Sequence, residues 1–221
     1  RAQVRSLQRA QMNANDGISM VQTAEGALNE VSGMLVRMRE LAIEANNGAL
    51  VGADQDSLQA EFSALIDEID RISQATTFNN VNLLDGTTST LTFQVGAGTT
   101  TNVDTIDLNL ANMRSTTLGI DSLDIGSAGN VSAAIIAIDA AIDTVTSSRG
   151  DFGAVQNRLI STINNLGVSV ENISAAESRI RDVDVAYETA DLTRNSIMQQ
   201  AALSMLAQAN MQPQVALSLL Q

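Results

Sequence analysis

The longest regular pattern in the sequence runs through residues 7–45, which read LQRAQMNANDGISMVQTAEGALNEVSGMLVRMRELAIEA. Small and apolar residues recur along it at alternating steps of three and four: Leu7, Ala10, Ala14, Gly17, Val21, Ala24, Leu28, Val31, Leu35, Met38, Ala42 and Ala45. This spacing keeps them on one side of an α-helix and is typical of coiled-coil packing. The alanines would let a neighbouring helix approach closely. The pattern therefore predicts a long helix that ends at Asn46-Asn47-Gly48, with Gly48 as a left-handed cap.

A shorter helix with the same spacing is predicted to follow. Its apolar positions are Leu58, Phe62, Leu65, Ile69 and Ile72, and the pattern ends near residue 74. Residues 54–57 offer several N-caps and place acidic side chains in the first turn, where the helix dipole favours them. The connection to the first helix is brief, so we expect the two helices to fold back as an antiparallel hairpin.

A third long helix is predicted from near Asn130. Its seam positions are Ile135, Ile138, Ile142, Val145, Arg149, Phe152, Gln156, Leu159, Ile163, Leu166, Val170, Ile173, Glu177 and Ile180. Gly150 and Gly153 each lower helix propensity by about 1 kcal/mol, which leaves open a displaced start or a break there. Because the first and third helices are both long and carry complementary seams, we expect them to lie side by side.

Residues 83–129 follow a different pattern of apolar and polar residues, without the helical spacing. The sequence LLDG at 83–86 carries a turn signal. Apolar and polar residues then alternate in two runs, separated by a loop rich in Gly and Thr; the apolar positions are Leu91, Phe93 and Val95, then Ile106, Leu108 and Leu110. This alternation predicts a small β-hairpin, and the region is too short for a second enzyme domain.

The last segment of the sequence carries no charge from Asn195 onward. Its apolar residues cover every side of a helix: Ile197, Met198, Ala201, Ala202, Leu203, Met205, Leu206, Ala207 and Ala209. A helix that is apolar all round has to be buried. We expect this segment to be disordered alone and to become ordered only against partners. Pro213 is predicted to end the helix, before an apolar terminus with Leu217, Leu219 and Leu220.

Together these patterns predict a mainly α fold: a long coiled-coil-like helical bundle with a small β-hairpin region and a helical C-terminal arm. We expect residues 1–82 to form the N-terminal part of a helical core domain and 83–129 a small β-rich region. Residues 130–182 would supply the C-terminal long helix of the core domain, and 183–221 the arm.

The composition of the 221 residues excludes many kinds of chemistry. The sequence has no Cys and no His, and all 12 basic residues are Arg. Disulfides, thiolate nucleophiles, imidazole bases and Schiff-base lysines are therefore excluded. The sequence Asp151-Phe152-Gly153 spells a kinase motif, but no lysine exists to hold phosphates and Phe152 occupies a seam position. We expect no catalytic residue, no metal site and no cofactor, and hence no enzyme.

The net charge of −13 disfavours two classes of partner. A phosphate backbone repels such a surface, and aromatic side chains that could stack on bases make up only 2% of the sequence. Anionic membranes are disfavoured for the same electrostatic reason. No uninterrupted apolar run reaches the ~18 residues typical of a membrane span. We therefore expect no binding to nucleic acid and no insertion into a membrane.

Charged residues gather beside the seam of the first helix. Arg37, Leu41 and Glu44 share one helical face, which makes Leu41 an apolar spot flanked by charges. The spacing favours a solvated face with an ion pair between Arg37 and Glu40. A surface for a partner is the alternative.

Several long motifs occur in a defined order along the chain. They are NANDGIS (13–19), QTAEGAL (22–28), RMRELA (37–42), FNNVNLLDG (78–86), SRIRD (178–182) and QAN (208–210). In this order they resemble the terminal regions of bacterial flagellin, and the resemblance covers nearly the whole chain except about residues 87–129. The resemblance implies a secreted, extracellular structural subunit that polymerises into the helical filament of the bacterial flagellum for swimming motility.

The resemblance also implies a role for the C-terminal segment. Residues 183–221 would be the polymerisation arm in the inner tube of the filament, with filament-core packing by Ile197, Leu203, Leu206, Leu217, Leu219 and Leu220. The arm would pair with an N-terminal arm, which we expect to be missing from this sequence. The small β-rich region implies no large outer domain. Expected partners are other flagellin subunits, hook-associated and cap proteins, and an export chaperone.

The charged group on the first helix gains a second interpretation from the resemblance. In many flagellins the residues that match Arg37, Leu41 and Glu61 contact Toll-like receptor 5, an innate immune receptor. Val36 stands where many of those flagellins carry Gln. We expect Leu41→Asp to abolish receptor signalling through a buried unpaired charge. Packing between subunits is the other role open to these residues.

Two other functions stay open at this point. A hook–filament junction protein, one of the hook-associated proteins, shares the terminal arms, although the motifs at 37–42 and 78–86 favour flagellin. An adhesin or coiled-coil binding module would use its arm as a monomer or a simple dimer. A flagellin with a zinc protease insert is excluded because the sequence has no His.

Overall fold

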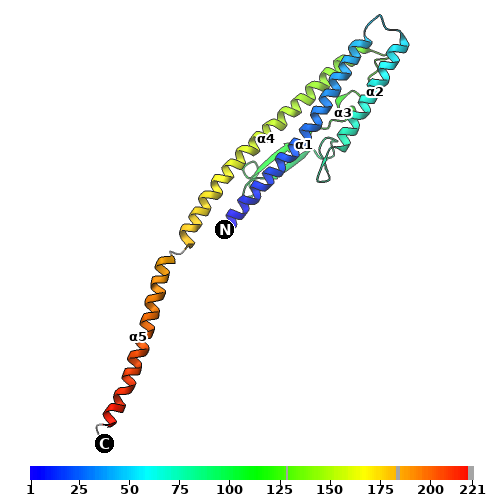
Figure 1. The fold of residues 1–221 in the computed structure, drawn as a ribbon. Coiled ribbons are helices and arrows are strands. Elements are labelled where there is room, and N and C mark those ends of the chain that lie inside the picture. Colours follow the sequence, from blue (N-terminus) through cyan, green and yellow to red (C-terminus); the bar gives the residue numbers. More distant parts are fainter. Residues whose placement is uncertain (128, 183–184, 219–221) are drawn as a thin grey trace. The chain divides into compact units, whose positions relative to one another are not determined.

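The computed structural model describes residues 1–127, 129–182 and 185–218 (Figure 1). Its elements are α1 (Ala2–Ala45), α2 (Gly52–Ala75), β1 (Thr77–Phe78), β2 (Val81–Asn82), β3 (Thr90–Gln94), β4 (Thr105–Asn109), α3 (Ser115–Leu118), α4 (Val131–Arg181) and α5 (Val185–Ser218). The chain forms two compact units, residues 1–172 and 173–221. Long helices with two small two-stranded sheets confirm the predicted fold class.

Helix α1 turns the predicted seam toward the core. Every residue of that seam is buried, as the alternating spacing requires. The helix begins before the seam, at Ala2. At its other end Asn46 is the C-cap, with φ −77°, and it donates its backbone N–H to the carbonyl of Ala42. The prediction of Gly48 as a left-handed cap is therefore wrong.

Gly17 interrupts the side chains of the α1 seam for a packing reason. A Cβ atom at this position would lie 3.2 Å from Cδ1 of Phe93 on β3 and 3.3 Å from Cδ1 of Leu159 on α4. The space that a side chain would need is thus taken by the Phe93 ring and the end of Leu159. At this point α1 packs against the β-hairpin and α4 together.

Helix α2 folds back on α1 as predicted, but it buries a different strip. Its buried residues are Phe62, Ile66, Ile69 and Ser73, whereas three predicted positions are half-buried: Leu58, Leu65 and Ile72. The strip is displaced because α2 packs on α1 and also on the segment after the first strands, where Ser73 Oγ donates to the carbonyl of Leu84 at 2.7 Å. The helix starts at Gly52 with Val51 as its N-cap, so the predicted capping by residues 54–57 is wrong.

Helix α4 runs without a break through Gly150 and Gly153 and lies beside α1 (Figure 1). The predicted positions Ile138, Val145, Phe152, Leu159 and Leu166 are buried. Between them the buried strip shifts by one residue, so that Ala134, Ala141, Ser148 and Val155 replace Ile135, Ile142, Arg149 and Gln156. Smaller side chains take these buried positions, and the larger predicted neighbours lie half-buried beside them. After Leu166 the predicted seam is half-buried or exposed.

Residues 77–109 form two antiparallel hairpins. β3 and β4 are the predicted one, with Phe93 opposite Ile106. β1 and β2 form a shorter hairpin that the sequence pattern did not indicate. Its turn places Asn79 and Asn80 at φ 47° and 65°, in the left-handed region that Asn tolerates better than most residues. The two adjacent asparagines are the signal that could have revealed it.

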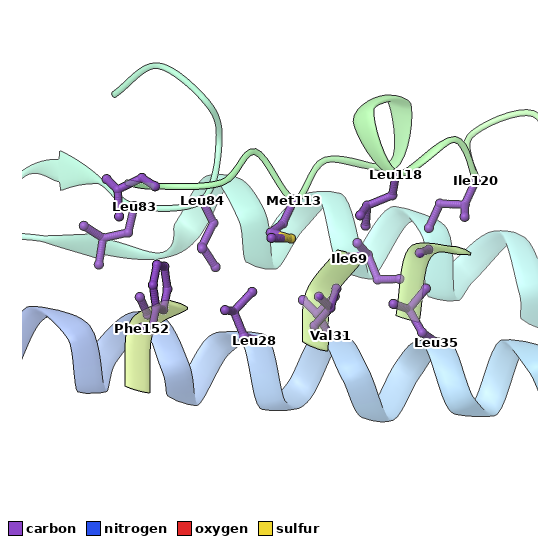
Figure 2. Close-up of a cluster of buried hydrophobic side chains, with 14 of the residues drawn as sticks. Leu28, Val31, Leu35, Ile69, Leu83, Leu84, Met113, Leu118, Ile120 and Phe152 are labelled. Atoms are coloured by element: carbon purple, nitrogen blue, oxygen red, sulfur yellow. The ribbon is translucent and has the colours of Figure 1, made fainter. Parts of the chain in front are cut away.

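The core of the first unit lies where α1, α2, α4 and residues 83–120 meet. Figure 2 shows side chains from all four converging on one space: Leu28, Val31, Leu35, Ile69, Leu83, Leu84, Met113, Leu118, Ile120 and Phe152. Nearly all of these side chains are aliphatic, as the scarcity of aromatic residues requires. The segment after β2 therefore covers the helices and belongs to their core.

The second unit contains the end of α4 and helix α5. Helix α5 continues through Pro213 to Ser218, so the prediction that Pro213 ends the helix is wrong. Proline has a φ of about −65°, which fits a helix, and its ring removes one hydrogen-bond donor. A proline therefore weakens a helix without always ending it.

One helical stretch among the described residues meets the length and composition of a membrane span. It is an 18-residue window that lies within the range Val131–Met211, which spans α4 and most of α5, and its mean hydropathy is 1.4. A core helix of a soluble protein meets the same criterion, and the part of α4 in the first unit is buried against the core along one side.

Candidate functional site

The first candidate surface is formed by the uncharged part of α5 and is called the α5 surface here. It consists of five large apolar residues with exposed fractions between 60% and 71%: Ile197, Met198, Leu203, Met205 and Leu206. No charged residue follows Arg194 in the sequence. The second unit therefore displays the kind of side chains that the first unit buries.

These five residues lie on different sides of α5, because successive residues of a helix are about 100° apart. A partner with one flat face would cover only part of them. Burial on all sides requires several neighbouring segments around the helix. Leu217, Leu219 and Leu220 are also expected in filament packing. The backbone of Leu217 belongs to α5, but its side chain lies outside the described part of the chain. Leu219 and Leu220 lie outside it altogether.

The second candidate surface joins α1 to α2 and is called the Arg37 cluster. Arg37 Nη2 lies 2.9 Å from Glu61 Oε1, and Arg37 Nη1 lies 3.2 Å from Glu40 Oε2. The hydrogen bond with Glu61, followed by that with Glu40, raises the pKa of Arg37. The side chains of Arg37 and Glu61 are 48% and 46% exposed. The predicted ion pair between Arg37 and Glu40 is confirmed, and the structure adds Glu61 to it.

Leu41 is not part of this exposed surface. Its side chain is 1% exposed, so the expectation of an apolar spot between charges is wrong. Helix α2 folds back along α1, and the core of the unit buries Leu41 although this residue lies outside the predicted seam. The period of the sequence identifies the buried seam, and the packing around the helix decides which residues beside it are buried as well.

Two ion pairs between α1 and α4 had no signal in the sequence. Arg39 Nε donates to Asp139 Oδ1 at 2.6 Å, and this bond raises the pKa of Arg39. Arg149 Nη2 lies 3.9 Å from Glu25 Oε1. The partners of the first pair are 100 residues apart in the sequence. Spacing along one helix predicts pairs three or four residues apart, and it carries no information about such distant partners.

Asp104, one of the paired acidic residues in the β-rich region, has a role in loop geometry. Asp104 accepts hydrogen bonds from the backbone N–H groups of Gly98 and Thr100, at 3.1 and 3.0 Å, and so closes the turn between β3 and β4. Among the described residues, no group of three or more acidic side chains is placed to hold a metal ion.

Comparison with known families accounts for the helices at both ends of the chain. The profile described as the bacterial flagellin N-terminal helical region matches residues 1–89, and the one described as the C-terminal helical region matches residues 135–220. The chain belongs to the bacterial flagellin family. A flagellin of Halalkalibacterium halodurans is 47% identical over 220 residues, which are 100% of this chain and 80% of that protein. The crystal structure of Bacillus cereus flagellin is similar with a TM-score of 0.62 at 32% identity, covering 75% of this chain and 94% of the other.

Family membership assigns the general role. The chain is a structural subunit that polymerises with other flagellin subunits into the bacterial flagellar filament, which serves motility. The filament is extracellular, and flagellins are structural proteins. A structure described as a flagellar hook-associated protein of Vibrio parahaemolyticus is similar with a TM-score of 0.65 at 19% identity, covering 78% of this chain and 92% of that one. At that identity the likeness concerns the fold alone.

Proposed function

We propose that α5 is the segment through which subunits pack together in the core of the filament. The observation that carries this proposal is the α5 surface, which is apolar on all sides and uncharged after Arg194. Burial of apolar area is favourable by roughly 25 cal/mol per Å². A filament core, where each helix is surrounded by several others, offers burial on every side.

The proposal gives the C-terminal segment 183–221 the role of polymerisation arm. Ile197, Leu203 and Leu206 would supply the packing contacts, together with Leu217, Leu219 and Leu220 beyond the described side chains. In the separate subunit the first three are exposed, so their burial is gained only on assembly. Ordering of the arm is then coupled to polymerisation.

A single charge on the α5 surface tests the proposal. Leu206→Asp would place a carboxylate in an apolar core without a partner, which is strongly unfavourable. We expect this variant to form no filaments in seeded polymerisation, measured by sedimentation and negative-stain electron microscopy. Val103→Asp is the matched control, because Val103 is an exposed apolar residue outside α5 and the change in net charge is the same.

The outcome separates packing from folding. Far-UV circular dichroism of Leu206→Asp should match that of the parent subunit, because the side chain has no buried contacts to lose there. Filament formation by Leu206→Asp at the parent's critical concentration would contradict the proposal. Only short caps on preformed ends, in the parent chain, would favour a hook–filament junction protein instead.

We further propose that the subunit is secreted, with an export chaperone that covers the α5 surface before assembly. Hook-associated and cap proteins would contact the ends of the polymer through the same kind of apolar packing. A chaperone that binds α5 should lose affinity for Leu206→Asp and keep it for Val103→Asp in calorimetric titrations. Equal affinity for both variants would contradict this role.

The Arg37 cluster supports a second proposal, a contact with Toll-like receptor 5. Arg37 and Glu61 are half-exposed and hold each other in place across two helices, whereas Leu41 would act only by keeping α1 and α2 packed. We expect Arg37→Ala and Glu61→Ala to reduce receptor signalling in a reporter cell assay. Arg71→Ala is the control, because Arg71 also forms an exposed ion pair on α2. Equal loss in all three variants would contradict a specific contact.

A further inference from the structure

The methionines of the described chain range from fully buried in the core of the first unit to largely exposed on α5. Met38 and Met113 in the first unit are fully buried, with 0% of each residue exposed. Met198 and Met205 on α5 are 65% and 71% exposed, and Met211 is 57% exposed. Oxidation of a thioether requires access of the oxidant to the sulfur. The methionines of α5 are therefore open to a dissolved oxidant while those of the core are shielded.

Met198 and Met205 share one side of α5. They are seven residues apart in the sequence, which is close to two full turns of a helix. Ile197 and Leu206 adjoin them in the sequence, so both thioethers belong to the α5 surface. A chemical change at either sulfur would alter the apolar character of that surface.

We propose that Met198 and Met205 form an oxidation-sensitive site that blocks assembly of the free subunit. The inference rests on the proposed packing role of α5. The oxidant is a peroxide: a lone pair of the sulfur attacks one peroxide oxygen, the S–O bond forms and the O–O bond breaks. The sulfur is oxidised by two electrons, and the departing hydroxide takes the proton of the new S–OH group, which leaves the sulfoxide and one water molecule.

The product is incompatible with dry packing around α5. A sulfoxide is polar and accepts hydrogen bonds, and a buried acceptor without a donor is unfavourable. The α5 surface offers no charged donor after Arg194. We expect each sulfoxide to raise the concentration needed for assembly about tenfold. Inside a filament the same sulfurs are covered, so assembled subunits resist the oxidant.

Met12 provides a control within the same molecule. It is 55% exposed on α1, and its sulfur accepts a hydrogen bond from Arg9 Nη1 at 3.7 Å. Peroxide should reach this sulfur as well. Because Met12 lies outside α5, its oxidation should leave assembly unchanged.

The first experiment uses the unmodified chain. Free subunits are oxidised partially with hydrogen peroxide and polymerised on filament seeds, and peptide mass spectrometry compares the pellet with the supernatant. We expect sulfoxides at Met198 and Met205 to be depleted about tenfold in the pellet, with Met12 sulfoxide equal in both fractions and Met38 unmodified. Equal sulfoxide at Met198 and Met205 in the two fractions would overturn the proposal.

A pair of variants then assigns the effect to these sulfurs. Leucine replaces methionine with little change in volume and has no sulfur to oxidise. After peroxide treatment the double variant M198L/M205L should keep its assembly, while M12L should lose it as the parent chain does. Treatment of the oxidised parent with methionine sulfoxide reductases and dithiothreitol should restore assembly. Loss of assembly by M198L/M205L to the same extent as the parent would overturn the proposal.

Failure of this inference is distinguishable from failure of the proposed function. If Leu206→Asp blocks filaments and oxidised subunits still assemble normally, only the oxidation-sensitive site is refuted. If Leu206→Asp assembles normally, the packing role of α5 is refuted, and with it the basis of the site.

Discussion

Helices α1 and α5 are both long and largely aliphatic, yet α1 is buried along one side in its own unit and α5 is exposed along its length. In α1 the buried small and apolar residues form a narrow strip, and polar and charged residues occupy most of the remaining surface. In α5 the apolar residues are spread over all sides. A few neighbouring segments within one chain can bury a narrow apolar strip. A helix that is apolar all round needs neighbours on every side, and a single subunit does not supply them.

The ion pairs of the first unit are a second difference between α1 and α5. Arg37 and Arg39 connect α1 to α2 and to α4 at the rim of the packed strip. Such exposed pairs contribute little to the free energy of unfolding, typically below about 1 kcal/mol. They define which helix faces which, while the buried strip provides the stability. The α5 surface has no such charged rim.

The largest expected effect breaks the buried strip of α1 with a charge. Leu41→Asp would bury an unpaired carboxylate, and we expect the free energy of unfolding to fall by roughly 3–5 kcal/mol. Ile43→Asp is the matched control, because Ile43 lies on the same helix and is 50% exposed. Urea unfolding followed by far-UV circular dichroism measures both. Equal destabilisation by the two variants would show that Leu41 is not shielded in the core of the first unit.

Truncation of one leucine on α1 and one on α5 compares the two helices directly. Leu28→Ala removes a fully buried side chain and should lower the free energy of unfolding by about 2–5 kcal/mol. Leu203→Ala removes the same atoms from an exposed position on α5, and should change the stability of the free subunit by less than about 0.5 kcal/mol. Urea unfolding, as above, measures the stability of both variants. A large loss from Leu203→Ala would mean that α5 is already packed within the subunit.

Removal of one buried hydrogen bond and one exposed hydrogen bond also compares the two units, with a smaller expected effect on stability. Ser73→Ala removes the buried bond to the carbonyl of Leu84 and should lower stability by roughly 0.5–1.5 kcal/mol, because that carbonyl keeps the backbone N–H of Met113 as a second donor. Ser204 on α5 donates to the carbonyl of Ala201 at 2.7 Å in an exposed position. Ser204→Ala should leave the unfolding midpoint nearly unchanged, and a similar shift for both would contradict the contrast.

The smallest expected effect concerns acid. Hydrogen bonds from the Thr87 hydroxyl, and also from the Thr87 N–H and from Asn82, lower the pKa of Asp85 in the folded chain. The stabilisation is therefore fully present above the ordinary Asp pKa of about 3.9 and is lost as the pH falls through the lowered value. Asp85→Asn should flatten the loss of unfolding free energy in that acidic range. An unchanged acid titration of stability would contradict a role for this carboxylate.

Much of the architecture could be predicted from local patterns. The alternating spacing identifies every buried seam position of α1, and alternation of apolar and polar residues locates β3 and β4. The motifs indicated the family before any geometry. Boundaries were less predictable: Gly48 does not cap α1 and Pro213 does not end α5, because a helix end depends on the hydrogen bonds available around it as well as on its residue types.

Some features of the two candidate surfaces could be predicted from the sequence, and others could not. Lack of charge after Arg194 and the all-round apolar pattern were readable in the sequence, and so was the pairing of Arg37 with Glu40. The burial of Leu41, the addition of Glu61 to the Arg37 cluster and the bond between Arg39 and Asp139 were not. Each of these depends on a second helix that lies distant in the sequence.

Periodicity is a property of one helix, so the order of residues alone determined where helices form and which side of α1 is apolar. How many neighbours a helix has is a property of the assembled core. The packing of the first unit therefore decided that Leu41 is buried beside the seam of α1 and that smaller residues of α4 are buried in place of the larger predicted ones. The α5 surface is as apolar as that core but is exposed in the separate subunit, and only the tertiary structure shows this difference, because burial depends on neighbours and not on residue type.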